Sequence, residues 1–60
     1  MDAKRLNQLM KEQYPYISYD ANLAEEYVKV GAPKLEKNEE VIAWCFADYL
    51  MSQGLCETED

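Results

Sequence analysis

The chain has 60 residues and a formal net charge of −6, from 12 Asp and Glu against 6 Lys and Arg, and it contains no His. A chain of this length is expected to form a single small domain, residues 1–60, which buries only about 60% of the surface that its unfolded chain exposes. Without His, the chain lacks the commonest general base, the base of Ser-His and Cys-His nucleophile pairs and the usual ligand of mixed zinc sites. We therefore expect a protein that is not an enzyme, with no catalytic residues, no metal and no cofactor.

The two cysteines, Cys45 and Cys56, are too few for a disulfide scaffold, and their positions within and after a predicted helix should keep them apart. The sequence contains no apolar run near the roughly 20 residues that a bilayer requires. Its first ten residues do not have the apolar centre of a signal peptide. These features predict a cytoplasmic protein with reduced thiols.

Three helices are predicted along the chain, so the expected fold is all-α, a small three-helix domain. The first helix covers residues 3–14, with Asp2 as its N-cap and Pro15 at its end. Residues 15–20, PYISYD, favour extended backbone, but no second convincing strand is available to pair with them. We therefore predict an irregular tyrosine-rich connector between the first two helices.

The second helix is expected to begin at Asp20 and to end at Gly31. A strand over residues 26–30 is the competing interpretation, because the sequence YVKV is β-prone. The apolar spacing over the whole segment fits a period of 3.6 better than a period of 2, which favours the helix. Residues 31–37 then form the turn into the third helix.

The third helix, residues 38–54, holds the only Trp and the only Phe of the chain, and we expect the other elements to pack against it. Asn38 is its predicted N-cap, carboxylates in the first turn favour the positive end of the helix, and Gly54 supplies the left-handed residue that ends it. One broad apolar arc is expected to face the core; it consists of Ile42, Ala43, Cys45, Phe46, Tyr49 and Leu50.

A second apolar stripe runs along another side of the same helix. Trp44, Ala47 and Met51 follow helical spacing there, and Glu40 and Asp48 edge them. An aromatic anchor with a polar edge is typical of a protein interface. The predicted partner-binding residues are therefore Glu39, Glu40, Trp44, Ala47, Asp48 and Met51. The alternative is that the first helix covers this stripe and all of it is core, and the sequence does not decide between the two.

Negative charge is concentrated in the last part of the chain. Residues 38–60 contain no Lys or Arg, whereas positive and negative residues balance over residues 1–37. A surface of this kind repels phosphates and attracts basic surfaces. The last five residues, 56–60, are expected to form a flexible acidic tail.

These features predict a small acidic protein that binds another protein. The preferred hypothesis is an inhibitor of the phage or mobile-element type, which acts as a nucleic-acid mimic on a basic nucleic-acid-binding surface of a host protein complex. No direct contact with nucleic acid or with a membrane is expected. A structural or regulatory homodimer sealed through Trp44, Ala47 and Met51 is the first alternative. A helix-turn-helix-like DNA-binding protein is the second; its recognition helix would begin with Glu39 and Glu40, which repel phosphates.

Overall fold

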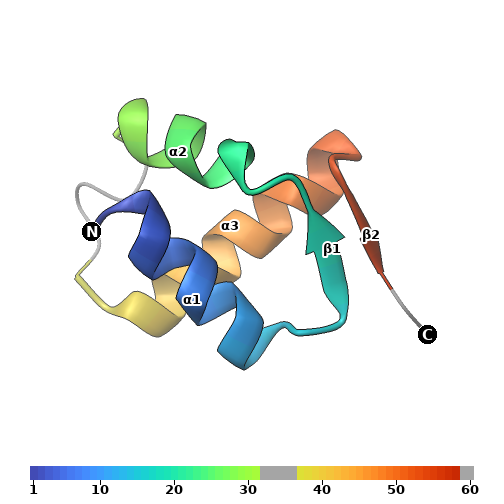
Figure 1. Cartoon of the computed structure of the whole chain (residues 1–60), viewed down its shortest axis with the longest axis horizontal. Helices are drawn as coiled ribbons and strands as arrows, with labels where there is room; N and C mark the ends of the chain where they lie inside the picture. Colours follow the sequence, from blue (N-terminus) through green and yellow to red (C-terminus); the bar gives the residue numbers. More distant parts are fainter. Residues whose placement is uncertain (32–36, 59–60) are drawn as a thin grey trace.

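Figure 1 shows the computed structural model of the chain, in which residues 1–31 and 37–58 are described. Helices and strands follow one another in the order α1 (Ala3–Gln13), β1 (Ile17–Tyr19), α2 (Asn22–Lys29), α3 (Glu39–Gln53) and β2 (Cys56–Thr58). In Figure 1, α1 crosses in front of α3, and the two strands lie together at one end of the molecule. The fold is mostly helical with a small two-stranded sheet.

The ends of α3 are set by local sequence signals. The side-chain oxygen of Asn38 accepts a hydrogen bond from the Glu40 N–H at 3.0 Å, which satisfies one of the free donors of the first turn. At the other end Gly54 adopts φ +66°, and the Leu55 N–H donates to the Leu50 carbonyl at 2.9 Å. This is the Schellman ending that a left-handed glycine permits. The predicted bounds of this helix are confirmed to within a residue.

Aspartates also lie near the amino ends of the other two helices: Asp2 is the N-cap of α1, whereas α2 begins at Asn22 with Ala21 as its N-cap, two residues after the predicted start at Asp20. The Asp2 carboxylate accepts from the Arg5 N–H at 2.8 Å, and the Asp20 carboxylate accepts from the Asn22 N–H at 2.9 Å. Gly31 follows α2 with φ +78°. The helical interpretation of this segment is therefore confirmed over the competing strand for residues 26–30. The turn predicted for residues 31–37 contains residues 32–36, which lie outside the described residues.

The core is one cluster of buried apolar side chains that draws on all three helices and on β1. Its members are Leu6, Leu9, Met10, Ile17, Ala24, Ile42, Ala43, Phe46, Ala47 and Leu50. Phe46 is fully buried, and its ring centroid lies 4.9 Å from that of Tyr27 and 5.3 Å from that of Tyr19. Edge-to-face and tilted ring pairs at these distances add to the stabilisation that burial provides. Tyr49 and Cys45, predicted on the core arc, lie at its edge and are partly exposed.

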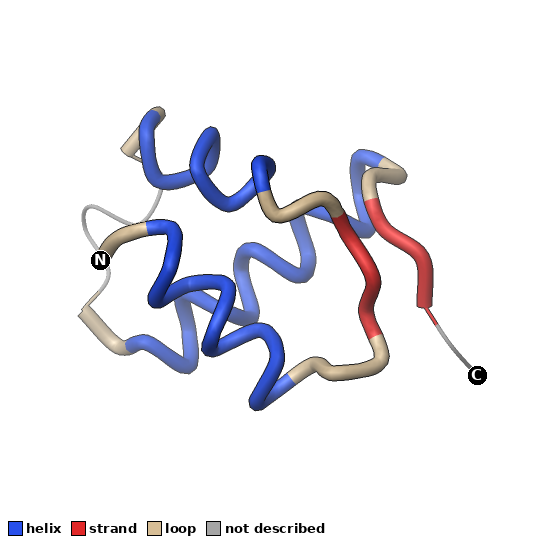
Figure 2. Tube along the Cα trace, in the orientation of Figure 1, coloured by secondary structure: helices blue, strands red, loops and turns tan. Residues whose placement is uncertain are grey.

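The sheet corrects the prediction of an all-α fold. β1 and β2 lie side by side (Figure 2). They pair antiparallel, with Ile17 opposite Thr58 and Tyr19 opposite Cys56. Part of the predicted irregular connector is thus a strand, and residues 56–58 of the predicted flexible tail are its partner; residues 59–60 lie outside the described residues. The physical reason is the turn at Gly54, which brings the chain back beside β1. Strands of three residues are too short to show the alternation of apolar and polar residues on which a sequence prediction relies.

Candidate functional site

The side of α3 that faces away from the core carries an exposed surface that we call the outer face, formed by Glu40, Val41, Trp44, Asp48 and Met51. These residues fall within about 100° of one another around the helix axis, at 100° per residue. Trp44 is 60% exposed, Met51 is 49% exposed and Val41 is 37% exposed. Of the two alternatives left open by the sequence, the structure therefore shows the one in which the indole and its methionine neighbour reach solvent.

Ala47 is the member of the predicted stripe that does not belong to the outer face. Its exposure is only 4%, and it is part of the core cluster. The reason is its position, about 60° from Trp44 around the helix on the side of the core, combined with a side chain too short to reach outward. Val41 takes its place on the outer face. Val41 is three residues before Trp44, and that spacing is the signal by which it could have been found.

The outer face makes α3 apolar on both sides. Phe46 and Leu50 are fully buried on the inner side, while Trp44 and Met51 are exposed on the other. A helix that is apolar all round is normally covered all round, whereas a surface helix has a polar side. Large apolar side chains that share one exposed face, with charged residues beside them, are the usual composition of a protein-binding surface.

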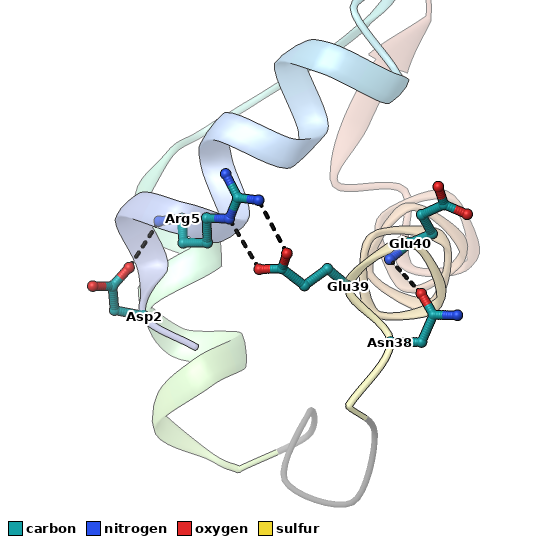
Figure 3. Close-up of polar contacts among 5 residues, drawn as sticks. All are labelled: Asp2, Arg5, Asn38, Glu39 and Glu40. Carbon is teal, nitrogen blue, oxygen red and sulfur yellow. Dashed lines mark hydrogen bonds and ion pairs between the residues drawn. The ribbon is translucent and has the colours of Figure 1, made fainter.

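Glu39, predicted as a partner-binding residue, has its carboxylate engaged within the chain. Arg5 donates to it twice, from Nε at 2.9 Å and from a terminal nitrogen at 3.0 Å (Figure 3). Figure 3 shows the Glu39 side chain pointing towards α1, whereas the Glu40 side chain points away from this ion pair. The hydrogen bond and the charge of Arg5 hold the pKa of Glu39 below its usual value. The pair ties the start of α3 to α1, so we assign Glu39 to the fold and leave Glu40 and Asp48 as the carboxylates of the outer face.

The electrostatic character of the outer face follows from the sequence around it. Glu40 and Asp48 are both exposed, and the segment 38–58 contains no Lys or Arg. Lys4 and Lys11 lie on α1 and not on the outer face. Together with Asn7 they border a shallow groove of about 330 Å³. The molecule therefore has an acidic apolar surface on α3 and a pair of lysines on one face of α1.

A second groove lies between α2 and α3 and was not predicted. It has a volume of about 450 Å³, and its lining is formed by Glu26, Tyr27, Lys29, Val30 and Tyr49. Val30 is 78% exposed, because it directly follows the end of α2. Burial raises the pKa of Tyr27, and the neighbouring Cys45 and Tyr49 contribute in the same direction. Glu26 and Lys29 give this groove both signs of charge, so its chemistry does not select one class of ligand.

Within residues 1–31 and 37–58, no group of three or more Cys, Asp or Glu side chains is placed to hold a metal ion. Both cysteines are free thiols, as predicted. No helix in the described part of the chain has the length and apolar character needed to cross a bilayer.

Comparisons of this chain with protein-family models, with curated proteins and with solved structures found no match. The outer face is therefore interpreted from its own geometry and chemistry.

Proposed function

We propose that this protein is a non-enzymatic binding protein, which uses the outer face of α3 to occupy a basic, nucleic-acid-binding surface of a partner protein. The observation that carries the proposal is the 60% exposure of Trp44 between Glu40 and Asp48. Trp is enriched among the few residues that dominate binding energy, and it acts best where surrounding residues exclude water from it. Val41 and Met51 are placed to take that surrounding role.

The charge of the outer face favours a basic partner. Its two carboxylates have no cation beside them on α3, and a positive surface would be attracted to them before contact. Positively charged protein surfaces are common among proteins that bind nucleic acid, because Lys and Arg on these surfaces neutralise the phosphates. An acidic helix on such a surface competes with the nucleic acid. An inhibitor from a phage or other mobile element would have this size and charge.

A homodimer through the same face is disfavoured by the position of Asp48. This residue lies between Trp44 and Met51 along the helix axis, and within about 60° of both around it, so two copies packed face to face would bury both Asp48 carboxylates without a cation to pair with them. Burying an unpaired charge is costly. A basic partner pairs with the same carboxylate.

The test is capture of partners from a host lysate by the tagged full chain at low and at high salt. We expect a basic nucleic-acid-binding protein to be retained at low salt, to be released by added nucleic acid and by salt, and to be lost with Trp44→Ala. The control is Tyr16→Ala, which removes an aromatic residue that is 46% exposed but lies outside α3. If no nucleic-acid-binding protein is retained by the wild-type chain at low salt, the proposal is wrong.

A further inference from the structure

We infer that the outer face is an arginine-binding site, in which a partner guanidinium stacks on the Trp44 indole and donates hydrogen bonds to Glu40 or Asp48. This inference rests on the proposed function, because it specifies the side chain by which the basic partner is recognised. It makes a stronger claim than charge attraction alone, since it requires the site to prefer arginine over lysine.

The spacing on α3 supports a site with three parts. Glu40 lies four residues before Trp44 and Asp48 lies four residues after it, so each carboxylate is one helical turn from the indole. Residues four apart have Cβ atoms about 5–6 Å from each other on a helix surface. Helical side chains also lean towards the amino end, which carries Asp48 back over the turn of Trp44. A flat cation placed on the indole would therefore have carboxylate oxygens at its edge.

The carboxylates of the site are free to accept. Within the described ranges, neither the Glu40 nor the Asp48 carboxylate has an ion pair or a side-chain hydrogen bond; the hydrogen bond at Glu40 uses its backbone N–H. Trp44 has more than half of its surface open to solvent. The same helix already binds one guanidinium through a carboxylate, because Arg5 holds Glu39 with two hydrogen bonds. That pair faces α1, so the outer face remains open to a partner.

Arginine suits this site better than lysine for three reasons. Its guanidinium is planar and can lie flat on an aromatic ring, it is less strongly hydrated than an ammonium, and it presents several donors at its edge that match carboxylate oxygens. A lysine ammonium can pair with one carboxylate, but it gains little from the flat face of the indole. We expect a preference for arginine of roughly three- to tenfold in affinity.

The experiment uses two synthetic peptides of equal length and charge, hexa-arginine and hexa-lysine, titrated into the full chain at low salt. Because the chain contains one Trp, the fluorescence of Trp44 reports directly on the site, and calorimetry gives the affinity for variants that lack it. We expect hexa-arginine to bind three- to tenfold more tightly and to change the Trp44 emission. With Trp44→Leu we expect the preference for hexa-arginine to shrink, because the stacking contact is lost and only the hydrogen bonds to the carboxylates still favour arginine.

The carboxylates are tested by the double variant Glu40→Gln with Asp48→Asn, which should weaken both peptides. Its matched control is Glu25→Gln with Glu26→Gln, which makes the same change in net charge on α2 and should weaken them less. Circular dichroism confirms that each variant remains folded.

Three outcomes would overturn the inference: no binding of hexa-arginine, equal affinity of the wild-type chain for the two peptides, or a preference for arginine that is as large in Trp44→Leu as in the wild-type chain. Each of these is distinct from failure of the proposed function. Retention of a basic partner from lysate, together with equal affinity for the peptides, would keep the function and remove the arginine site. A selective arginine site without such a partner would do the reverse.

Discussion

Phe46 and Trp44 are two residues apart on α3, and we predict that replacing each with Ala has very different effects on stability. Phe46 is fully buried against two tyrosine rings, so Phe46→Ala should cost about 3–5 kcal/mol in free energy of unfolding. A chain of this length has a total stability of about 3–9 kcal/mol. The Phe46 variant should therefore lose most or all of its cooperative folding at 25 °C.

The structure sets an upper limit on the cost of Trp44→Ala. Trp44 is 60% exposed, and the covered remainder of a side chain of about 250 Å² is about 100 Å². At about 25 cal/mol per Å² this area contributes at most about 2.5 kcal/mol, and the better helix propensity of Ala offsets about 0.5 kcal/mol of it. The expected loss is therefore below about 2 kcal/mol, and the variant should remain folded.

The assay is urea unfolding followed by far-ultraviolet circular dichroism, since the indole of Trp44 is already wet in the folded chain and its emission reports folding poorly. We expect Phe46→Ala to cost more than Trp44→Ala. If Trp44→Ala destabilises the protein as much as Phe46→Ala does, the indole is not on an open surface, and the outer face is not available to a partner.

Three further predictions concern the ion pair of Arg5 with Glu39, the phenol of Tyr27 and the glycine that ends α3. Arg5 lowers the pKa of Glu39 from its usual 4.5, so the ion pair stabilises the fold above that pH, and this stabilisation is lost as the pH falls through the lowered pKa. Glu39→Gln should therefore lower the melting temperature at pH 7 but not near pH 2. A difference in melting temperature between the variant and the wild-type chain that does not change with pH would contradict this. Burial raises the pKa of Tyr27 above its usual 10.0, so the phenol loses its proton more readily in the unfolded chain, and stability falls as the pH rises beyond about 10. Tyr27→Phe should move the midpoint of alkaline unfolding to higher pH. An unchanged midpoint would argue against this. Gly54→Ala places a side chain at φ +66°, where no atom beyond its own residue and its two chain neighbours lies within 4 Å of the added Cβ. Urea unfolding should therefore show a loss of about 1–2 kcal/mol from backbone strain alone, which D-alanine introduced by synthesis should largely avoid.

The helices were predictable because their boundaries are encoded locally. Asp2 and Asn38 precede their helices by one residue and accept hydrogen bonds from the first turn, and Gly54 has the backbone conformation that ends α3. Each signal depends on a few neighbouring residues only. The sheet depends instead on residues about 40 positions apart that meet because α3 and its terminal turn bring them together. No local pattern contains that information.

The candidate site was predictable in part for the same reason. Helical spacing placed Trp44 and Met51 on a common side, but which side of α3 the first helix would cover is a question of packing between elements. One contact between the two helices, that of Arg5 with Glu39, joins residues 34 positions apart in the sequence. Ala47 shows the limit of assigning faces by angle: a small side chain near the boundary between two faces is covered by its larger neighbours.

Folding and binding depend on the same helix, and this affects how variants of it must be interpreted. A partner that covers the outer face binds only the folded chain, so at a concentration 100 times its dissociation constant it adds about 2.7 kcal/mol to the apparent stability. That gain approaches the lower end of the cost of about 3–5 kcal/mol expected for Phe46→Ala. A weak-binding Phe46 variant should therefore recover binding when the partner is in large excess, since its defect is a small folded fraction. Trp44→Ala removes the contact of the indole with the partner and leaves the folded fraction high. Excess partner should therefore saturate this variant only at concentrations above its raised dissociation constant, and its helical content should not increase.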